Sequence, residues 1–219
     1  MSKLEILYED KHIICVVKPY GIMSQGNENT HSLCDDIADY LVSKGESGEV
    51  FVVHRLDKTT GGVMVYAKTK KAASKLSTMV AENKLFKTYL AVVGGSIEKE
   101  SDTLSDLLYH DKQKNKTYVV KRERKGVKTA RLTYNVLGVK DYVSNTVTLV
   151  KVKLHTGRTH QIRVQFASRK LPLVGDRKYG STIFCSDIAL WSHSLEFEHP
   201  ITNELLSVCA EPISEIFAF

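Results

Sequence analysis

The chain has 219 residues, of which 42% are hydrophobic and 26% are charged, and its formal net charge is +6. This composition is ordinary for a soluble globular protein and argues against a disordered chain. No stretch approaches the roughly 18 consecutive apolar residues that a membrane-spanning helix needs, and the first residues lack the apolar core of a signal peptide. The positive charge is compatible with a polyanionic partner but does not establish one.

The cysteines are widely spaced and form no C-x-x-C pair, which argues against a disulfide framework or a zinc knuckle. They are Cys15, Cys34, Cys185 and Cys209. We therefore expect a protein of the reducing cytoplasm.

The first half of the chain predicts short strands that enclose a polar loop. Residues 4–8 and 12–18 are expected to be strands around a turn, and apolar residues at helical spacing predict a helix over 30–44. The β-branched runs 50–53 and 63–67 are predicted strands, and the sequence between them is polar and rich in Gly and Thr. A polar loop mounted between two buried strands is a common place for catalytic groups.

The second half contains further strands and two helices. Thr69 is a plausible N-cap for a helix whose apolar residues fall on one face, and residues 159–168 predict a second helix with Ile162 and Phe166 facing inward. The predicted strands are 86–93, 127–137, 146–154, 188–191, 195–198 and 205–209. Because strands outnumber helices and do not alternate with them regularly, we predict an α+β fold. We expect one domain over residues 1–219, with a mixed, mainly antiparallel central sheet flanked by helices and loops.

The loop HRLDKTTGG, residues 54–62, is the first candidate for chemistry. It places Asp57 among Arg55, Lys58 and two threonines. Neighbouring cations and hydroxyl donors stabilise the charged form of a carboxylate, and an ionised carboxylate that is held in place serves as a nucleophile or a base. The alternative is an ordinary surface loop with a local Asp–Lys pair. A phosphate-binding P-loop is excluded because its glycine and lysine pattern is absent.

The sequence LHTGRTHQIRVQ, residues 154–165, is the second candidate. Arg158, His160 and Arg163 crowd the predicted start of a helix, where cations oppose the helix dipole. Local stability does not explain them, so we expect an anion there, either a carboxylate from elsewhere in the chain or a phosphate. A zinc site at His155 and His160 is disfavoured by their spacing and by the lack of a third ligand. We therefore predict no metal.

The segment from Lys116 to Arg131 alternates short β-like pieces with seven basic residues. They are Lys116, Lys121, Arg122, Arg124, Lys125, Lys128 and Arg131. One interpretation is an arm that contacts the phosphates of a nucleic acid without regard to base sequence. The other is a solvated hairpin whose charge serves solubility, and the sequence favours neither.

Five motifs, in order over roughly residues 12–180, resemble those of the RluA-type RNA pseudouridine synthases. Besides HRLDKTTGG and HTGRTHQIR, they are Lys18-Pro19-Tyr20-Gly21, Lys87-Thr88-Tyr89, and Pro172-Leu173-Val174-Gly175-Asp176 with Tyr179-Gly180. The family usually has serine at the position of Gly61, and we expect the glycine to loosen the loop without altering the catalytic position. The resemblance implies the pseudouridine synthase catalytic fold. Many members carry a small RNA-binding domain ahead of the first motif, and we expect none here.

The resemblance also implies residue roles. Asp57 matches the catalytic aspartate, Arg163 the arginine that pairs with it, and Tyr89 the tyrosine that stacks on the target base. Position alone favours a core aromatic of a half-buried strand for Tyr89, and the resemblance reverses this preference. Arg55 matches the arginine that fills the gap left by the extruded nucleotide, and Ile162 an apolar pocket position. Our predicted substrate-binding residues are therefore Arg55, His54, Leu56, Arg158, His160 and Ile162. Lys18 and Gly21 are expected to be structural.

The implied function is isomerisation of specific uridines to pseudouridine in structured RNA, either rRNA or tRNA. The reaction is redox-neutral and adds no group, so we expect no cofactor. The target nucleotide must leave its stack, which costs a few kcal/mol. Stacking on Tyr89 at about 1–3 kcal/mol offsets that cost. The alternatives are a non-catalytic RNA-binding module and a nucleoside glycosidase. The expected partner is an RNA stem-loop, with no membrane, no protein partner and a monomeric state.

Overall fold

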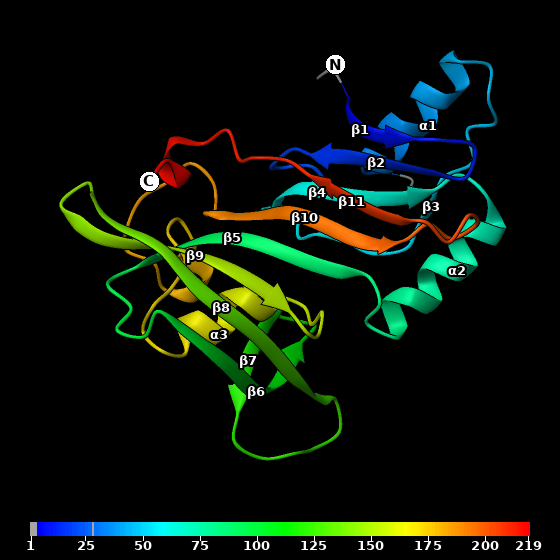
Figure 1. The fold of residues 1–219 in the computed structure, drawn as a ribbon. Coiled ribbons are helices and arrows are strands. Elements are labelled where there is room, and N and C mark those ends of the chain that lie inside the picture. Colours follow the sequence, from blue (N-terminus) through cyan, green and yellow to red (C-terminus); the bar gives the residue numbers. More distant parts are fainter. Residues whose placement is uncertain (1–3, 28) are drawn as a thin grey trace. The chain divides into compact units, whose positions relative to one another are not determined.

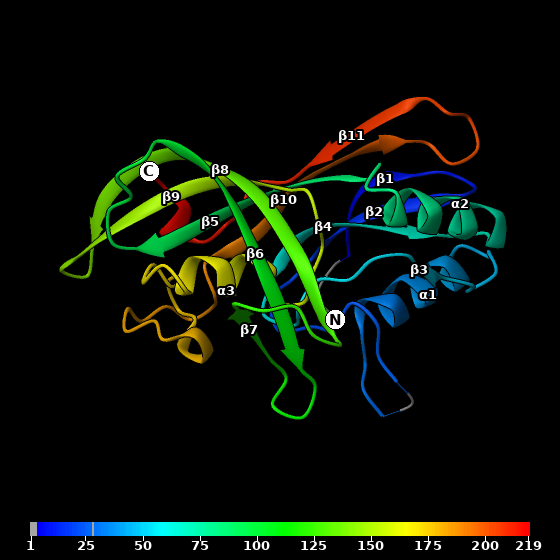
Figure 2. The same ribbon diagram turned by 90° about the horizontal axis from the view of Figure 1, so that it is seen from below.

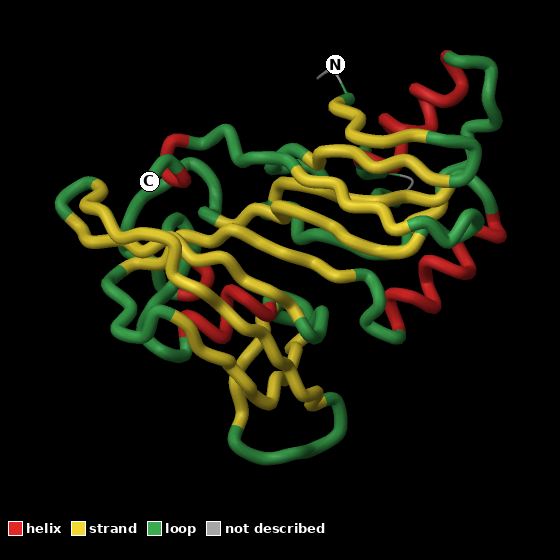
Figure 3. Tube along the Cα trace, in the orientation of Figure 1, coloured by secondary structure: helices red, strands yellow, loops and turns green. Residues whose placement is uncertain are grey.

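The computed structural model describes residues 4–27 and 29–219, and the chain divides into two compact units (Figure 1). Unit 1 comprises Met1–Lys87 and Ser192–Pro212, and unit 2 comprises Thr88–Trp191 and Ile213–Phe219. Strands form most of the regular structure in each unit (Figure 3). Among the described residues, no helix combines the length and apolar character needed to cross a membrane. The single catalytic domain stays a prediction.

Unit 1 is a sheet whose strands follow the order β1, β2, β4, β10, β11, with β3 also paired to β4. The pairs β1–β2, β2–β4, β3–β4 and β10–β11 are antiparallel. The strands are β1 Glu5–Glu9, β2 Ile13–Lys18, β3 Phe51–Val52, β4 Gly61–Ala67, β10 Leu190–Glu198 and β11 Leu205–Cys209, and β10 begins in unit 2. The helices are α1 Leu33–Ser43 and α2 Lys70–Ala81.

The core of unit 1 explains why β2 and β4 read as unbroken apolar runs. Every residue of both strands is buried, so both faces of this part of the sheet are covered. On one face, alternate residues such as Ile13 and Val65 pack with Ala72 and Leu76 of α2. Thr69 caps that helix as predicted, because its Oγ1 accepts a hydrogen bond of 3.3 Å from the backbone N–H of Ala72.

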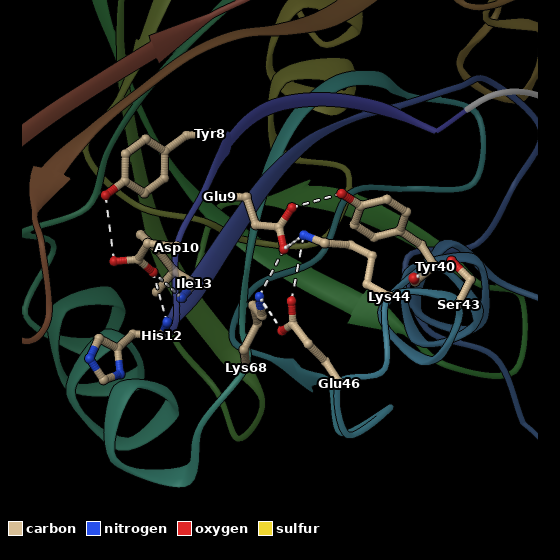
Figure 4. A network of polar contacts seen from close by, with 10 residues as sticks. All are labelled: Tyr8, Glu9, Asp10, His12, Ile13, Tyr40, Ser43, Lys44, Glu46 and Lys68. Atoms are coloured by element: carbon tan, nitrogen blue, oxygen red, sulfur yellow. Dashed lines mark hydrogen bonds and ion pairs between the residues drawn. The ribbon is translucent and has the colours of Figure 1, made fainter.

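A charged network ties β1 and α1 to the segment after β4 (Figure 4). Glu9 accepts hydrogen bonds from Lys68 at 2.8 Å, Lys44 at 2.9 Å and the Tyr40 hydroxyl at 2.9 Å. Burial by itself raises the pKa of Glu9, but these donors outweigh burial and lower the pKa to about 2. Glu46 also pairs with Lys68, at 2.6 Å, and lies 3.5 Å from Lys44. The network therefore holds elements distant in sequence together.

Unit 2 is a sheet in the order β5, β9, β8, β6, β7 (Figures 1 and 2). The strands are β5 Phe86–Gly94, which begins in unit 1, β6 Ser101–Asp111, β7 Lys116–Val120, β8 Val127–Tyr142 and β9 Asn145–Leu154. Strand β8 pairs antiparallel with both β6 and β9. The short helix α3, Gln161–Ala167, packs against β6 and β7, and the 3₁₀ turns η1 Arg177–Tyr179 and η2 Glu215–Phe217 complete the unit.

Three strands differ from the sequence predictions. Strand β8 continues to Tyr142, beyond its predicted end at residue 137. Strand β6 was not predicted, because Ser, Thr and Asp occupy many of its positions and are uncommon in strands. Its apolar residues Leu104 and Leu108 face the core, whereas Ser101, Thr103 and Ser105 are exposed. Strand β10 is continuous where a break between 191 and 195 was expected. Ser192 continues it, since its buried hydroxyl donates a 3.0 Å hydrogen bond to the carbonyl of Val63 on β4.

Candidate active site

The loop that carries Asp57 joins β3 to β4 in unit 1 and is held by the segment that follows β2. The backbone N–H of Leu56 donates to the Ser24 hydroxyl at 3.0 Å, and that hydroxyl donates back to the Leu56 carbonyl at 3.1 Å. On the other side of Asp57, the Lys58 carbonyl accepts a 2.9 Å bond from the N–H of Gly21. The backbone is thus held by hydrogen bonds on both sides of Asp57.

Lys18 supports the same loop from inside unit 1. Its side chain is fully buried, and its Nζ donates to the carbonyls of Ile22 at 2.8 Å, Pro19 at 2.9 Å and Lys58 at 3.4 Å. Burial lowers the pKa of Lys18 to about 8, opposed by the negative charge of Asp57. The sequence assigned Lys18 a structural role, and its three contacts fit that role. It also places a buried cation near Asp57.

Two further residues of the loop are set by packing. His54 is buried, and its Nε2 accepts a 3.1 Å hydrogen bond from the backbone N–H of Val65. Burial, and then the charge of Lys87, lower its pKa well below the usual value, so the ring is neutral. This position favours support of the loop over direct contact with RNA. Gly62 has φ +113°, and a Cβ there would lie 2.2 Å from the Ser192 carbonyl oxygen, so glycine is required.

The central feature of unit 2 is a buried ion pair between Arg163 on α3 and Asp176 before η1. Arg163 Nε lies 2.6 Å from Asp176 Oδ2, and Nη2 lies 2.9 Å from Oδ1. Both residues are almost completely buried. Of the two anions expected near the start of this helix, a carboxylate from elsewhere in the chain is therefore present. The contact uses one edge of the planar guanidinium, and pairing of Arg163 with Asp57 stays a prediction.

Tyr179 extends this pair into a polar network. Its hydroxyl accepts a 2.8 Å bond from the N–H of Thr117 on β7 and lies 2.9 Å from Nδ1 of His160, the residue before α3. The Arg163 guanidinium lies 5.1 Å from the centre of the Tyr179 ring. Burial raises the pKa of Tyr179, although Thr117 and Arg163 oppose the increase. Thr117, Asp176 and Tyr179 connect β7, α3 and η1.

The other predicted site residues are distributed over both units. In unit 1, Arg55 is exposed and Leu56 is buried. In unit 2, Tyr89 on β5 and Ile162 on α3 are buried, and Arg158 is exposed with its Nε donating to the carbonyl of Thr129 at 3.0 Å. The roles assigned to these residues stay predictions. Within the described ranges, no group of three or more His, Cys, Asp or Glu side chains is arranged to hold a metal ion.

Sequence reasoning missed four contributors to this arrangement. Ser24, Thr117, Asp176 and Tyr179 make contacts with residues 13 to 62 positions away. Asp176 and Tyr179 lie in the late motif that the sequence analysis identified, but the sequence did not indicate which residues they contact. Ser24 and Thr117 are single hydroxyl residues in unremarkable surroundings and carried no signal.

A model of the family described as RNA pseudouridylate synthase matches residues 12–168 of the chain. The chain belongs to this family. The matched region contains Asp57, Tyr89 and Arg163. This confirms the family to which the five motifs pointed.

Curated relatives of the chain are also pseudouridine synthases by name. The chain is 34% identical over 208 residues to an uncharacterized RNA pseudouridine synthase of Bacillus subtilis, YhcT, covering 94% of this chain and 67% of the relative. It is 34% identical over 215 residues to ribosomal large subunit pseudouridine synthase D of Nitrosomonas europaea, covering 93% and 60%. It is 31% identical over 222 residues to tRNA pseudouridine synthase C of Vibrio parahaemolyticus, covering 93% and 88%. The chain thus spans about 60 to 90% of the length of these three relatives.

A solved structure supports the fold. Human RNA Pseudouridylate Synthase Domain Containing 1 is 24% identical and superposes with a TM-score of 0.78 over 96% of this chain and 84% of that chain. The predicted α+β pseudouridine synthase fold is confirmed.

Proposed function

We propose that this chain isomerises uridine to pseudouridine within structured RNA, with Asp57 as the catalytic carboxylate. The observation that carries the proposal is the hydrogen bonding that holds the loop around Asp57. Hydrogen bonds to Leu56 and Lys58 fix the loop on both sides of it, and Lys18 lies buried beneath. These bonds restrain the backbone on both sides of Asp57, and a restrained backbone is one requirement for positioning a reactive group. Membership of the pseudouridylate synthase family supports the same assignment.

The chemistry replaces one carbon–nitrogen bond by one carbon–carbon bond and moves one hydrogen from carbon to nitrogen. The bond from ribose carbon 1 to base nitrogen 1 breaks, the base turns, and carbon 5 joins the ribose. Carbon 5 then loses its hydrogen as a proton, and nitrogen 1 gains one. The Asp57 carboxylate either attacks ribose carbon 1 as the bond to nitrogen 1 breaks and is then displaced by carbon 5, or adds to base carbon 6 and is eliminated from it after the base has turned. Both routes return the carboxylate unchanged and need neither an oxidant nor a transferred group. Water must be excluded while the base is detached, since hydrolysis would otherwise end the reaction.

Roles for the surrounding residues follow from the proposal. Arg163, held on one edge by Asp176, is assigned here as the charge partner of the Asp57 carboxylate. Tyr89 stacks on the extruded base, and Ile162 lines the apolar side of the base pocket. Arg55, exposed beside Asp57, occupies the space that the base leaves in the RNA stack. His54 and Leu56 support the loop from the buried side.

We extend the proposal to the RNA partner on the basis of the relatives' names. One is named for the large ribosomal subunit and another for tRNA. The substrate of this chain is accordingly a uridine in a structured segment of rRNA or tRNA, where unstacked bases and helix shape are recognised together. We also propose that the protein acts on this RNA as a monomer and without a protein partner.

Labelled RNA tests the function. Large-subunit rRNA and tRNA are prepared with tritium on uridine carbon 5 from cells that lack the gene, and each is incubated with the protein. Isomerisation releases tritium to water because carbon 5 loses its hydrogen. Glycosidase action instead releases free labelled uracil, and an RNA-binding module gives RNA binding with neither product. Either of the last two outcomes contradicts the proposal, and the RNA that yields tritiated water identifies the substrate class.

Arg163→Ala separates two roles for this arginine. We expect a large fall in the single-turnover rate with nearly unchanged RNA affinity, because the arginine acts on Asp57. A loss of affinity alone would place Arg163 on an RNA phosphate instead.

A further inference from the structure

The positive charge of the chain is concentrated in one segment. We define the basic arm as residues 112–131, which contain nine lysines and arginines and a single acid, Glu123. The arm therefore carries +8, whereas the whole chain carries +6, so the remaining 199 residues carry −2. General solubility does not explain this distribution, because the charge is not spread over the surface.

The arm runs through the β6–β7 turn, strand β7, the β7–β8 loop and the start of β8 (Figure 1). Eight of its nine basic residues are exposed, and Lys116 is half-buried. In the part of the chain that the structure describes, none of the nine forms an ion pair with a carboxylate. Like charges placed this close repel one another, so an anionic ligand would relieve a cost that the fold leaves uncompensated.

Two tyrosines of the arm region already contact cations. Tyr109 on β6 and Tyr118 on β7 face each other across the strands. The Arg124 guanidinium lies 4.5 Å from the centre of the Tyr109 ring, and Lys116 Nζ lies 5.8 Å from that of Tyr118. These rings orient cations, whereas single-stranded RNA is bound mainly by open aromatic platforms. The arm is thus better suited to phosphates on the outside of a helix than to unstacked bases.

The arm is fastened to the network around Arg163. Besides the bond from its N–H to Tyr179, Thr117 donates through Oγ1 to the Thr159 carbonyl at 2.8 Å. Lys178 Nζ donates to the Asn115 carbonyl in the β6–β7 turn at 3.0 Å. These bonds join the arm to η1 and to the residues just before α3. A ligand on the arm is consequently held in fixed register with Arg163.

We propose that the basic arm binds the phosphate backbone of the RNA helix that flanks the target uridine. This rests on the proposed function. These phosphate contacts do not depend on base sequence and fix the position of the RNA helix on the protein. The RNA loop around the target uridine supplies the specificity.

The test compares two charge-matched triple variants. The arm variant carries Lys121→Gln, Arg122→Gln and Lys125→Gln. These changes retain the contact between Arg124 and the Tyr109 ring. The control carries Lys70→Gln, Lys71→Gln and Lys75→Gln, three exposed lysines of α2. Binding to a fluorescein-labelled 20-base-pair RNA duplex of unrelated sequence is measured over a range of salt concentrations. Near-native fluorescence of the single tryptophan, Trp191, verifies folding of the unit that contains the arm.

Three lost phosphate contacts should reduce the slope of log Kd against log salt by about 2–3 and weaken binding roughly 10- to 100-fold near 0.1 M salt. The control should bind within about twofold of wild type. An unchanged slope in the arm variant overturns the proposal, and so does an equal loss in the control. Binding to vesicles containing anionic phosphatidylglycerol is measured in the same way. Equally tight wild-type binding to them, lost equally in the arm variant, would assign the arm to membrane surfaces instead.

Turnover on the tritiated RNA distinguishes this proposal from the proposed function. The arm variant should need a higher RNA concentration for half-maximal rate but keep the wild-type rate at saturation. If the wild type releases no tritium, the proposed function fails while the duplex measurement still decides the role of the arm. If the wild type is active and the arm variant matches it at every RNA and salt concentration, the arm proposal alone fails.

Discussion

The buried pair of Arg163 and Asp176 permits a quantitative test of how unit 2 is held together. Their two contacts are 2.6 and 2.9 Å long, and side-chain exposure is 5% and 0%, so solvent screens the pair very little. Removing one member leaves the other charged and buried, which costs about 3–5 kcal/mol, whereas removing both avoids that cost. Asp176→Asn and Arg163→Met should each destabilise unit 2 by this amount. The double variant should lose no more than either single one, which corresponds to a coupling of about 3–5 kcal/mol.

The assay is urea unfolding followed by fluorescence of Trp191. It is the only tryptophan in the sequence, it lies in unit 2, and it is 4% exposed, so its signal reports this unit. Single losses below about 1 kcal/mol, or a double variant whose loss equals the sum of the single losses, would refute the view that this pair is a coupled, desolvated unit.

Three further predictions concern unit 1. Glu9 has its pKa lowered from 4.5 to about 2, so its ionised form contributes up to about 3 kcal/mol. That stability is present above pH 4.5 and lost as the pH falls toward 2, and Glu9→Gln should remove this part of the acid titration followed by circular dichroism. Lys18 has its pKa lowered from 10.5 to about 8. The folded chain then binds fewer protons than the unfolded chain, so stability should rise by up to about 3 kcal/mol between pH 8 and 10.5. Lys18→Met should show a smaller rise in urea unfolding over that range; an unchanged rise would assign the effect elsewhere. Gly62→Ala should destabilise by at least about 2 kcal/mol through its clash with Ser192 and strained φ. Gly21→Ala, with φ +80° and open space around it, is the matched control and should lose clearly less.

Local patterns predicted the elements that depend on local forces. The apolar runs of β2 and β4 are buried on both faces, and Thr69 caps α2 through a neighbour three residues away. Strand β6 could not be predicted this way. Its polar positions are explained by their surroundings, since Asp106 accepts hydrogen bonds from Gln165 and Arg169 about 60 residues further on. Tertiary context overrides strand propensity here.

The candidate site divides along the same line. The polar loop around Asp57 was recognisable because two apolar strands bracket it. Its support was not, because Lys18 reaches the Lys58 carbonyl across 40 residues. The basic residues at the start of α3 predicted an anion, and only the fold shows that Asp176 supplies one for Arg163. Motif order identified the family, whereas the hydrogen bonds that hold the motifs required coordinates.

The most direct test of the central claim is a single-turnover measurement of pseudouridine in the substrate RNA with Asp57→Asn, an isosteric change that removes only the charge and the nucleophilic oxygen. The product is quantified by mass spectrometry of digested RNA, alongside Kd for the same RNA. We predict no detectable pseudouridine and an affinity equal to or better than that of the wild type. Substantial product formation by this variant would contradict the assignment of the reaction to Asp57.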